Sequence, residues 1–145
     1  SLRVGMNSRL DTIQAAILLE KLKIFADEID LRQGVAERYA RGLRGGVKGV
    51  PGVIEGGRSV WAQYVIEHDN RDGLQAHLTA NGIPSMVYYP VPIHQQDFAL
   101  SYAPAEGHLK VTEAASQHVL ALPMHPYLGE ADQDRIIDTV LGFNG

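Results

Sequence analysis

Apolar side chains return every three or four positions along the first third of the chain. Residues 7–43 contain no proline, and their apolar positions follow a helical repeat: Leu10, Ile13, Ile17, Ile24, Ile29, Val35, Tyr39 and Leu43. This spacing predicts an amphipathic helix, with Asn7 or Ser8 as its cap and Asp11 in its first turn. Such a helix would be roughly 50 Å long at 1.5 Å per residue. We therefore expect it to bend within residues 27–34 and to pack its first half against protein outside these residues.

Four later segments carry strand patterns. They are residues 53–54, 60–67, 83–89 and 119–122. Residues 60–67 alternate and are rich in β-branched and aromatic side chains, whereas residues 53–54 are a short apolar pair inside a glycine-rich loop. Proline follows residues 83–89 and 119–122, and it ends a strand because it has no N–H to donate.

Helical patterns fill the intervals between these strands, over residues 70–82, 95–100, 109–118 and 129–141. Asn70 or Asp72 caps the first of them and Asn81-Gly82 ends it. Acidic residues crowd the start of the last, where the helix dipole favours them. The order of elements predicts an α/β (α+β) fold, in which helices cover a small sheet of three or four strands.

The composition is that of one globular domain. The 145 residues are 45% hydrophobic and 21% charged, which is ordinary for such a domain. The net charge of −4, without a basic run, argues against nucleic acid and anionic membranes as partners. Cysteine is absent, so disulfides and thiolate metal sites are excluded. No apolar run is long enough to cross a bilayer, and we expect a cytoplasmic location.

Histidine and lysine positions favour neither a metal site nor a Schiff base. The six histidines stand singly, without the paired spacing typical of zinc sites. A Schiff-base lysine needs a desolvated or electropositive pocket. Lys21 and Lys23 fall on a charged helix face, Lys48 in a glycine loop and Lys110 on a surface-like helix. We therefore assign no catalytic or metal-binding residue in this chain.

The start of the long helix is the first candidate binding site. Residues 5–9 read Gly-Met-Asn-Ser-Arg. Free N–H groups at a helix start, joined by the side chains of Asn7 and Arg9, suit a phosphate or a carboxylate. In the plainer interpretation Asn7 only caps the helix and Arg9 only pairs with an acid. The pattern alone favours the plainer interpretation.

The second candidate is the double-proline loop, residues 88–94. A strand end runs there into Tyr-Tyr-Pro-Val-Pro-Ile-His. Prolines hold a loop in place at low entropic cost, which helps to present the phenols of Tyr88 and Tyr89 and the imidazole of His94 to a ligand. The same residues would serve equally well as an aromatic lid over the core. The pattern leaves both possibilities open.

Several motifs follow one another in a family-like order. They are Gly-Met-Asn-Ser-Arg-Leu-Asp-Thr-Ile-Gln-Ala-Ala-Ile-Leu at residues 5–18, Ser-Val-Trp-Ala-Gln-Tyr at 59–64, Gly-Ile-Pro at 82–84, Tyr-Pro-Val-Pro-Ile-His at 89–94 and Leu-Pro-Met-His-Pro-Tyr-Leu at 122–128. Together they resemble the DegT/DnrJ/EryC1/StrS group of pyridoxal-phosphate sugar aminotransferases. The chain is most similar to members that act on UDP-linked 3-keto-N-acetyl uronic acids in lipopolysaccharide biosynthesis.

The resemblance implies the C-terminal part of a fold-type-I aminotransferase. Residues 1–44 would be the interdomain helix with a loop near the dimer interface and the cofactor. Residues 45–145 would be the small C-terminal domain, with a largely antiparallel sheet. The cofactor lysine, the Asp on the pyridine nitrogen and most phosphate ligands would lie upstream of these residues.

The resemblance also implies roles for the two candidate loops in a homodimer. Asn7 would reach the cofactor phosphate of the neighbouring subunit, with Arg9 close by. Tyr88, Tyr89 and His94 would face the nucleotide sugar. Many members have His-Tyr where this chain has Tyr-Tyr, so the role of Tyr88 stays open.

The implied reaction has two halves. L-glutamate donates its amine to pyridoxal phosphate, and the amine then passes to a keto nucleotide sugar such as a UDP-sugar. The cofactor is the electron sink and the protein orients the reactants. This part of the enzyme would be inactive alone. Two alternatives remain: a non-catalytic dimerisation or small-domain module, and a relative that dehydrates sugars with His in place of the cofactor lysine.

Overall fold

The structure is a computed structural model that describes residues 10–102 and 109–145. Its elements in chain order are α1 (Thr12–Leu22), α2 (Phe25–Leu43), β1 (Tyr64–Glu67), α3 (Arg71–Ala80), the 3-10 turns η1 (Ile93–Gln95) and η2 (Asp97–Tyr102), α4 (Lys110–His118), β2 (Val119–Leu122) and α5 (Glu130–Leu141). Strands β1 and β2 form an antiparallel sheet, in which Tyr64 pairs with Leu122 and Glu67 with Val119.

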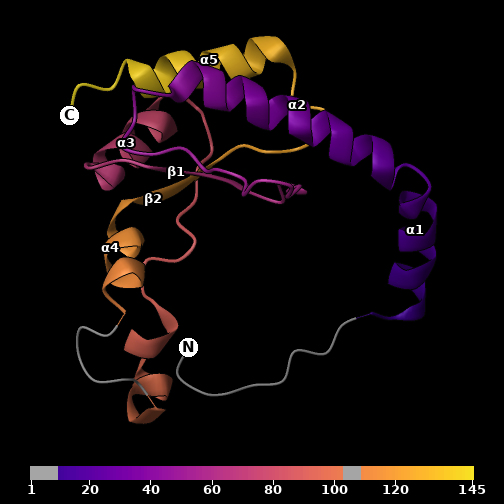
Figure 1. The fold of residues 1–145 in the computed structure, drawn as a ribbon, viewed down its shortest axis with the longest axis horizontal. Coiled ribbons are helices and arrows are strands. Elements are labelled where there is room, and N and C mark those ends of the chain that lie inside the picture. Colours follow the sequence, from indigo (N-terminus) through magenta and orange to yellow (C-terminus); the bar gives the residue numbers. More distant parts are fainter. Residues whose placement is uncertain (1–9, 103–108) are drawn as a thin grey trace.

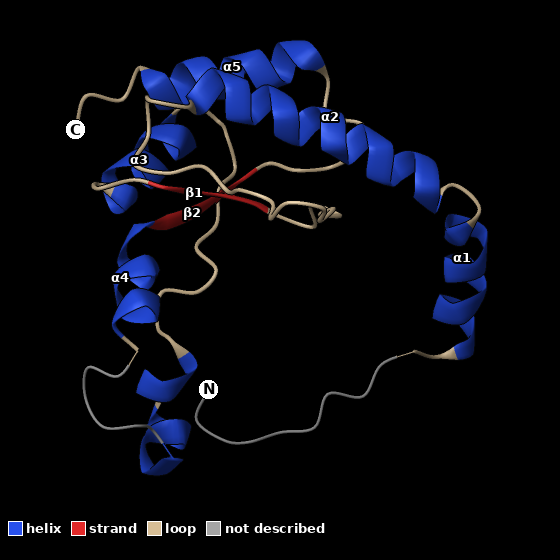
Figure 2. Cartoon of the chain, in the orientation of Figure 1, coloured by secondary structure: helices blue, strands red, loops and turns tan. Residues whose placement is uncertain are grey.

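Helices α2 and α5 lie side by side over this short sheet, and α3 packs below α5 (Figures 1 and 2). Helix α4 runs away from the sheet directly before β2, and α1 projects from the far end of α2. The apolar faces of α2, α3, α5 and both strands meet in one core, formed by Val35, Ala36, Tyr39, Leu43, Trp61, Tyr64, Ile66, Leu74, Leu78, Ile83, Leu120, Leu122, Ile136, Ile137 and Val140.

Three aromatic rings occupy the centre of this core. The ring of Tyr64 lies 4.9 Å from that of Tyr39 and 5.7 Å from that of Trp61, between ring centroids. The Tyr39 hydroxyl donates a hydrogen bond to the Pro123 carbonyl at 3.0 Å. Burial raises the pKa of the Tyr64 phenol to about 12 and also raises the pKa of Tyr39, because the charged form loses its hydration. Both phenols are therefore neutral at physiological pH.

Polar contacts join α2 to α5 around the apolar core. The buried amide of Gln133 donates to the Val35 carbonyl at 2.6 Å. The Arg38 guanidinium lies 2.7 Å from the Asp134 carboxylate and 3.1 Å from that of Glu130. These contacts span nearly 100 residues of sequence, so they hold together elements that no local pattern connects.

The predicted long helix is two helices, with a break at Lys23 and Ile24 instead of within residues 27–34. The N–H groups of Lys23 and Ile24 reach carbonyls three residues back, as in a 3-10 turn. Gly34 stays inside α2 because its neighbours Val35 and Ala36 are packed in the core. Helix α1 buries no residue at all. The break therefore separates a packed helix from an unpacked one.

The cap of the first helix also differs from the prediction. Asp11 precedes α1, and its side chain accepts a hydrogen bond from the Gln14 N–H at 2.8 Å. A carboxylate in this position satisfies a free N–H and interacts favourably with the helix dipole. The predicted caps Asn7 and Ser8 lie outside the described residues. The other predicted helices are confirmed, with residues 95–100 forming 3-10 turns.

The small antiparallel sheet is confirmed, but among the described residues it has two strands instead of three or four. Single bridges flank it, from Gly49 to Glu67 and from Met86 to Ala121. Residues 53–54 form no strand, and residues 83–89 pair only at Met86. Continuing the Met86 register by two residues places Pro84 opposite Pro123. Neither proline has an N–H to donate to a strand partner. The pairing of this segment with β2 is therefore limited to the bridge at Met86.

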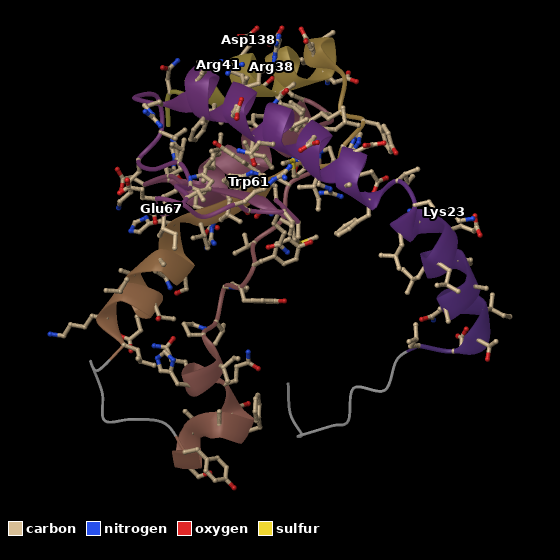
Figure 3. The ribbon with its side chains drawn as sticks, turned by 45° about the vertical axis from the view of Figure 1, so that its right-hand side comes forward. Lys23, Arg38, Arg41, Trp61, Glu67 and Asp138 are labelled. Carbon is tan, nitrogen blue, oxygen red and sulfur yellow. The ribbon has the colours of Figure 1, made fainter. Side chains whose placement is uncertain are left out.

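Strand β1 is shorter than the predicted strand over residues 60–67 because Trp61 is hydrogen-bonded to α2. Its carbonyl accepts from Arg32 at 2.8 Å, and its indole N–H donates to Gln33 at 2.8 Å. Its φ of 47° lies in the left-handed region, which takes it out of an extended strand. Figure 3 shows Trp61 beneath α2. The chain becomes extended three residues later, at Tyr64.

The exposed surface of α1 leads to a first prediction. Ile13 is 75% exposed and Ile17 is 55% exposed, and clustered apolar side chains of this kind favour association. We expect this 145-residue chain to self-associate, and the Ile13→Glu/Ile17→Glu double variant to be more monomeric in sedimentation experiments. Ile54→Glu, at an equally exposed position in the glycine loop, is the control and should change nothing. A wild-type chain that sediments as a monomer at all concentrations would contradict the prediction.

The hydroxyl of Tyr39 leads to a second prediction. Tyr39→Phe removes the hydrogen bond to Pro123 and leaves the ring in place, so it should lower the free energy of unfolding by about 1 kcal/mol. Tyr102→Phe is the matched control, because that side chain is exposed. Urea unfolding measures both variants. Equal stabilities would show that the hydroxyl adds nothing to the core.

Candidate functional site

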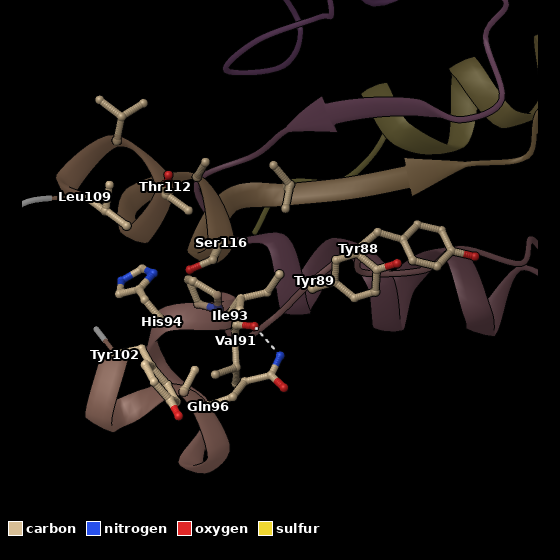
Figure 4. Close-up of a pocket in the computed structure, with 15 residues that line it drawn as sticks. Tyr88, Tyr89, Val91, Ile93, His94, Gln96, Tyr102, Leu109, Thr112 and Ser116 are labelled. Atoms are coloured by element: carbon tan, nitrogen blue, oxygen red, sulfur yellow. Dashed lines mark hydrogen bonds between the residues drawn. The ribbon is translucent and has the colours of Figure 1, made fainter. Parts of the chain in front are cut away.

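A hollow of about 940 Å³ lies between the double-proline loop and α4 (Figure 4). Its walls are mostly apolar, and its lining residues are Tyr88, Tyr89, Val91, Pro92, Ile93, His94, Gln96, Ala99, Tyr102, Leu109, Val111, Thr112, Ala115, Ser116 and Val119. This size is in the range of small-molecule sites, which combine apolar walls with a few polar groups. The structure thus brings Tyr88, Tyr89 and His94 together at one hollow.

Two fixed points hold the double-proline loop. At its start, the N–H and carbonyl of Met86 both bond to Ala121 of β2, at 3.2 and 2.8 Å. At its end, the chain turns into η1, where the Gln95 N–H donates to the Pro92 carbonyl at 3.0 Å. Between these points the backbone of Pro90 and Pro92 has restricted φ angles. The loop is therefore defined by its own residues and by the sheet edge.

The two tyrosines lie at the mouth of the hollow. Their rings meet edge to face, with centroids 5.8 Å apart. Tyr89 is 71% exposed, so its phenol is open to a ligand. Tyr88 also lines a second, smaller hollow of about 300 Å³, together with Gln63 and Met86. Neither tyrosine belongs to the core or to the side chains packed against it.

His94 is a largely buried polar residue of the wall, with a side chain 15% exposed. Its Nε2 lies 3.0 Å from Oε1 of Glu113 on α4. Sequence analysis did not identify Glu113 as a candidate. The two residues are 19 positions apart in different elements, so no local spacing could have indicated the pair.

The polar groups that line the hollow are phenols, hydroxyls, an amide and the His94 imidazole. None of the lining residues within residues 10–102 and 109–145 is a lysine or an arginine. Phenols, an imidazole and the Thr112 hydroxyl suit a ligand with hydroxyl or amide groups and a ring face. A phosphate group would need cations from outside this lining.

Pyridoxal phosphate attaches to enzymes through a lysine, so the surroundings of the lysines decide whether this chain could hold it. All four lysines of the chain fall in the described part and are exposed. Lys23 is paired with Glu20 and Lys48 with Asp69, each at 2.6 Å. A Schiff-base lysine needs a desolvated or electropositive pocket, and these exposed side chains have none. The candidate phosphate ligands Asn7 and Arg9 lie outside the described residues.

Two further histidines, His68 and His77, lie against an aromatic ring. His68 and His77 each lie 5.5 Å from the ring of Phe143, between centroids. In the part of the chain that the structure describes, no three His, Asp or Glu side chains are grouped so that they could hold a metal ion. No described helix is both long and apolar enough to span a membrane.

The arrangement of these helices over the short sheet occurs in solved sugar aminotransferases. An aminotransferase from Brucella abortus is 55% identical, with a TM-score of 0.88 over 99% of this chain and 38% of that one. DesV of S. venezuelae, solved with a ketimine intermediate, is 36% identical, with a TM-score of 0.86 over 94% of this chain and 37% of its own.

Residues 1–141 match the model of the DegT/DnrJ/EryC1/StrS aminotransferase family, and the chain belongs to that family. The UDP-2-acetamido-2-deoxy-3-oxo-D-glucuronate aminotransferase of Pseudomonas aeruginosa is 48% identical over 130 residues, which are 90% of this chain and 35% of that protein. The chain thus spans little more than a third of the length of these relatives.

The exposed lysines lead to a third prediction. Incubation of the 145-residue chain with pyridoxal phosphate, followed by borohydride reduction, should give only scattered, substoichiometric adducts, because all four lysines are exposed and none lies in a desolvated pocket. Mass spectrometry of the peptides measures the occupancy of each lysine. One lysine that saturates, together with turnover of L-glutamate, would contradict the prediction.

Proposed function

We propose that this chain is the C-terminal part of a pyridoxal-phosphate-dependent aminotransferase in the cytoplasm. The enzyme moves the amino group of L-glutamate to a keto nucleotide sugar for cell-surface polysaccharide biosynthesis, including lipopolysaccharide. Membership of the aminotransferase family supports the reaction class. The relative from Pseudomonas aeruginosa, whose name specifies a UDP-linked 3-oxo uronic acid, supports the substrate class.

The observation that carries the proposal is the hollow at which Tyr88, Tyr89 and His94 meet. A nucleotide sugar has planar and pyranose rings with many hydroxyl and amide groups. Exposed aromatic rings can cover a ring face, and phenol and imidazole groups can bond its hydroxyls. The hollow therefore suits the uncharged portion of the substrate, and both the diphosphate and the uronate carboxylate must be bound by cations elsewhere.

The reaction exchanges the amino group of an amino acid for the oxo group of a keto sugar. The amine leaves C2 of L-glutamate, which becomes 2-oxoglutarate, and the ketone of the sugar becomes an amine. In our proposal the residues of this chain hold and orient the sugar. Since the described residues offer no place to attach pyridoxal phosphate, the lysine that holds it must come from another part of the enzyme.

A homodimer completes the proposed active site. We assign Asn7 to the cofactor phosphate of the partner subunit and Arg9 to the same region. Residues 1–44 then form the interdomain segment, and residues 45–145 form the small domain, whose core α2 completes. The unburied surface of α1 supports this division, because such a helix needs further protein to cover it.

Two variants of the full-length enzyme test the proposal. Asn7→Ala should weaken cofactor retention by about 1–3 kcal/mol, the cost of one hydrogen bond to a charged group. Tyr89→Phe should leave cofactor binding intact and mainly raise the KM for the nucleotide sugar. Cofactor absorbance, melting temperature and sugar kinetics are measured on both.

A non-catalytic module predicts a different result from the same measurements. Both variants would then lose stability together, and kinetics per folded molecule would be unchanged. A dehydratase would consume the sugar without converting L-glutamate to 2-oxoglutarate. Either outcome would replace the proposed function.

A further inference from the structure

The His94–Glu113 pair connects the double-proline loop to α4 across one wall of the hollow. Nε2 of His94 lies 3.0 Å from Oε1 of Glu113. His94 lines the hollow, beside Thr112 and Ser116 in Figure 4, whereas Glu113 is not among the lining residues. Glu113 therefore contacts a lining residue without lining the hollow itself.

This contact determines which ring nitrogen carries a hydrogen. An ionised carboxylate only accepts hydrogen bonds, so Nε2 of His94 must be the donor. In a neutral imidazole, Nδ1 is then left as an acceptor. The structure gives no hydrogen bond to Nδ1 from the described residues, so this atom is available to a ligand.

Helix α4 carries the Glu113 carboxylate, and hydrogen bonds hold this helix in place. The Ser116 hydroxyl donates to the Glu113 carbonyl at 2.7 Å. At the end of α4, the buried guanidinium of Arg71 donates to the carbonyls of Ser116 and Val119, at 3.3 and 3.4 Å. These bonds join α4 to α3, so α4 holds the Glu113 carboxylate in a fixed position beside His94.

We infer that Glu113 is a positioning residue, which holds His94 in the tautomer whose Nδ1 accepts a hydrogen bond from the nucleotide sugar. The inference rests on the proposed function and identifies the group that this part of the site selects. A nucleotide sugar donates through hydroxyl and amide N–H groups, so the donor to Nδ1 is one of these uncharged groups of the substrate. A carboxylate behind a histidine is a common way to orient the ring.

Glu113→Gln in the full-length holoenzyme tests this role. The amide keeps the shape of the side chain but can both donate and accept, so the ring is free to change tautomer. The KM for UDP-2-acetamido-2-deoxy-3-oxo-D-glucuronate should rise by about tenfold, the effect of one weakened hydrogen bond. The kcat, the KM for L-glutamate, cofactor absorbance and melting temperature should stay unchanged. Glu37→Gln, on the exposed face of α2, is the matched control.

A double-mutant cycle separates positioning from simple packing. If Glu113 acts through His94, Glu113→Gln should add nothing in a His94→Gln background. Equal effects of Glu113→Gln with and without His94 would overturn the inference. So would a lower melting temperature with unchanged kinetics per folded molecule.

The Tyr89→Phe variant distinguishes failure of this role from failure of the proposed function. A raised sugar KM in Tyr89→Phe, with none in Glu113→Gln, would remove the role of Glu113 and keep the proposed function. No sugar-dependent release of 2-oxoglutarate by the wild-type enzyme would remove both.

Discussion

The rest of the structure depends on the contacts that the buried side chain of Tyr39 makes. Its ring lies against Tyr64 of β1, and its hydroxyl bonds the carbonyl of Pro123 directly after β2. One side chain thus joins α2 to both strands. A two-stranded sheet and a single helix are each marginal in water, so their stability comes from packing of this kind. Helix α5 completes the arrangement by lying beside the C-terminal part of α2.

The candidate site follows from this core. Strand β2 is fixed against β1, and its Ala121 holds the start of the double-proline loop through Met86. Helix α4 enters β2 directly, and buried Arg71 secures the junction. The two walls of the hollow therefore share one anchored strand. The core therefore sets the separation of the double-proline loop from α4, and the side chains of Tyr88 and Tyr89 at the mouth of the hollow do not.

The same structure divides the chain into a part that satisfies its own apolar surface and a part that does not. Helix α2 has its apolar face in the core, whereas α1 leaves Ile13 and Ile17 exposed. The relatives are almost three times as long as the matched region. We propose that the remainder of the enzyme and a partner subunit complete the active site. Three features support this proposal: the uncovered apolar surface of α1, the exposed lysines, and a hollow whose lining suits a nucleotide sugar.

The sequence by itself determined the order and type of most elements, because helical and strand periodicity, caps and prolines act locally. It also indicated Tyr88, Tyr89 and His94, since aromatic and imidazole groups on a proline-stiffened loop form a local pattern. Tertiary structure decided the rest. Packing kept α2 intact through Gly34, commitment of Trp61 to α2 shortened β1, and the pairing of Glu113 with His94 arose because folding brought two distant segments together. Such contacts have no periodicity along the chain, so only the folded structure reveals them.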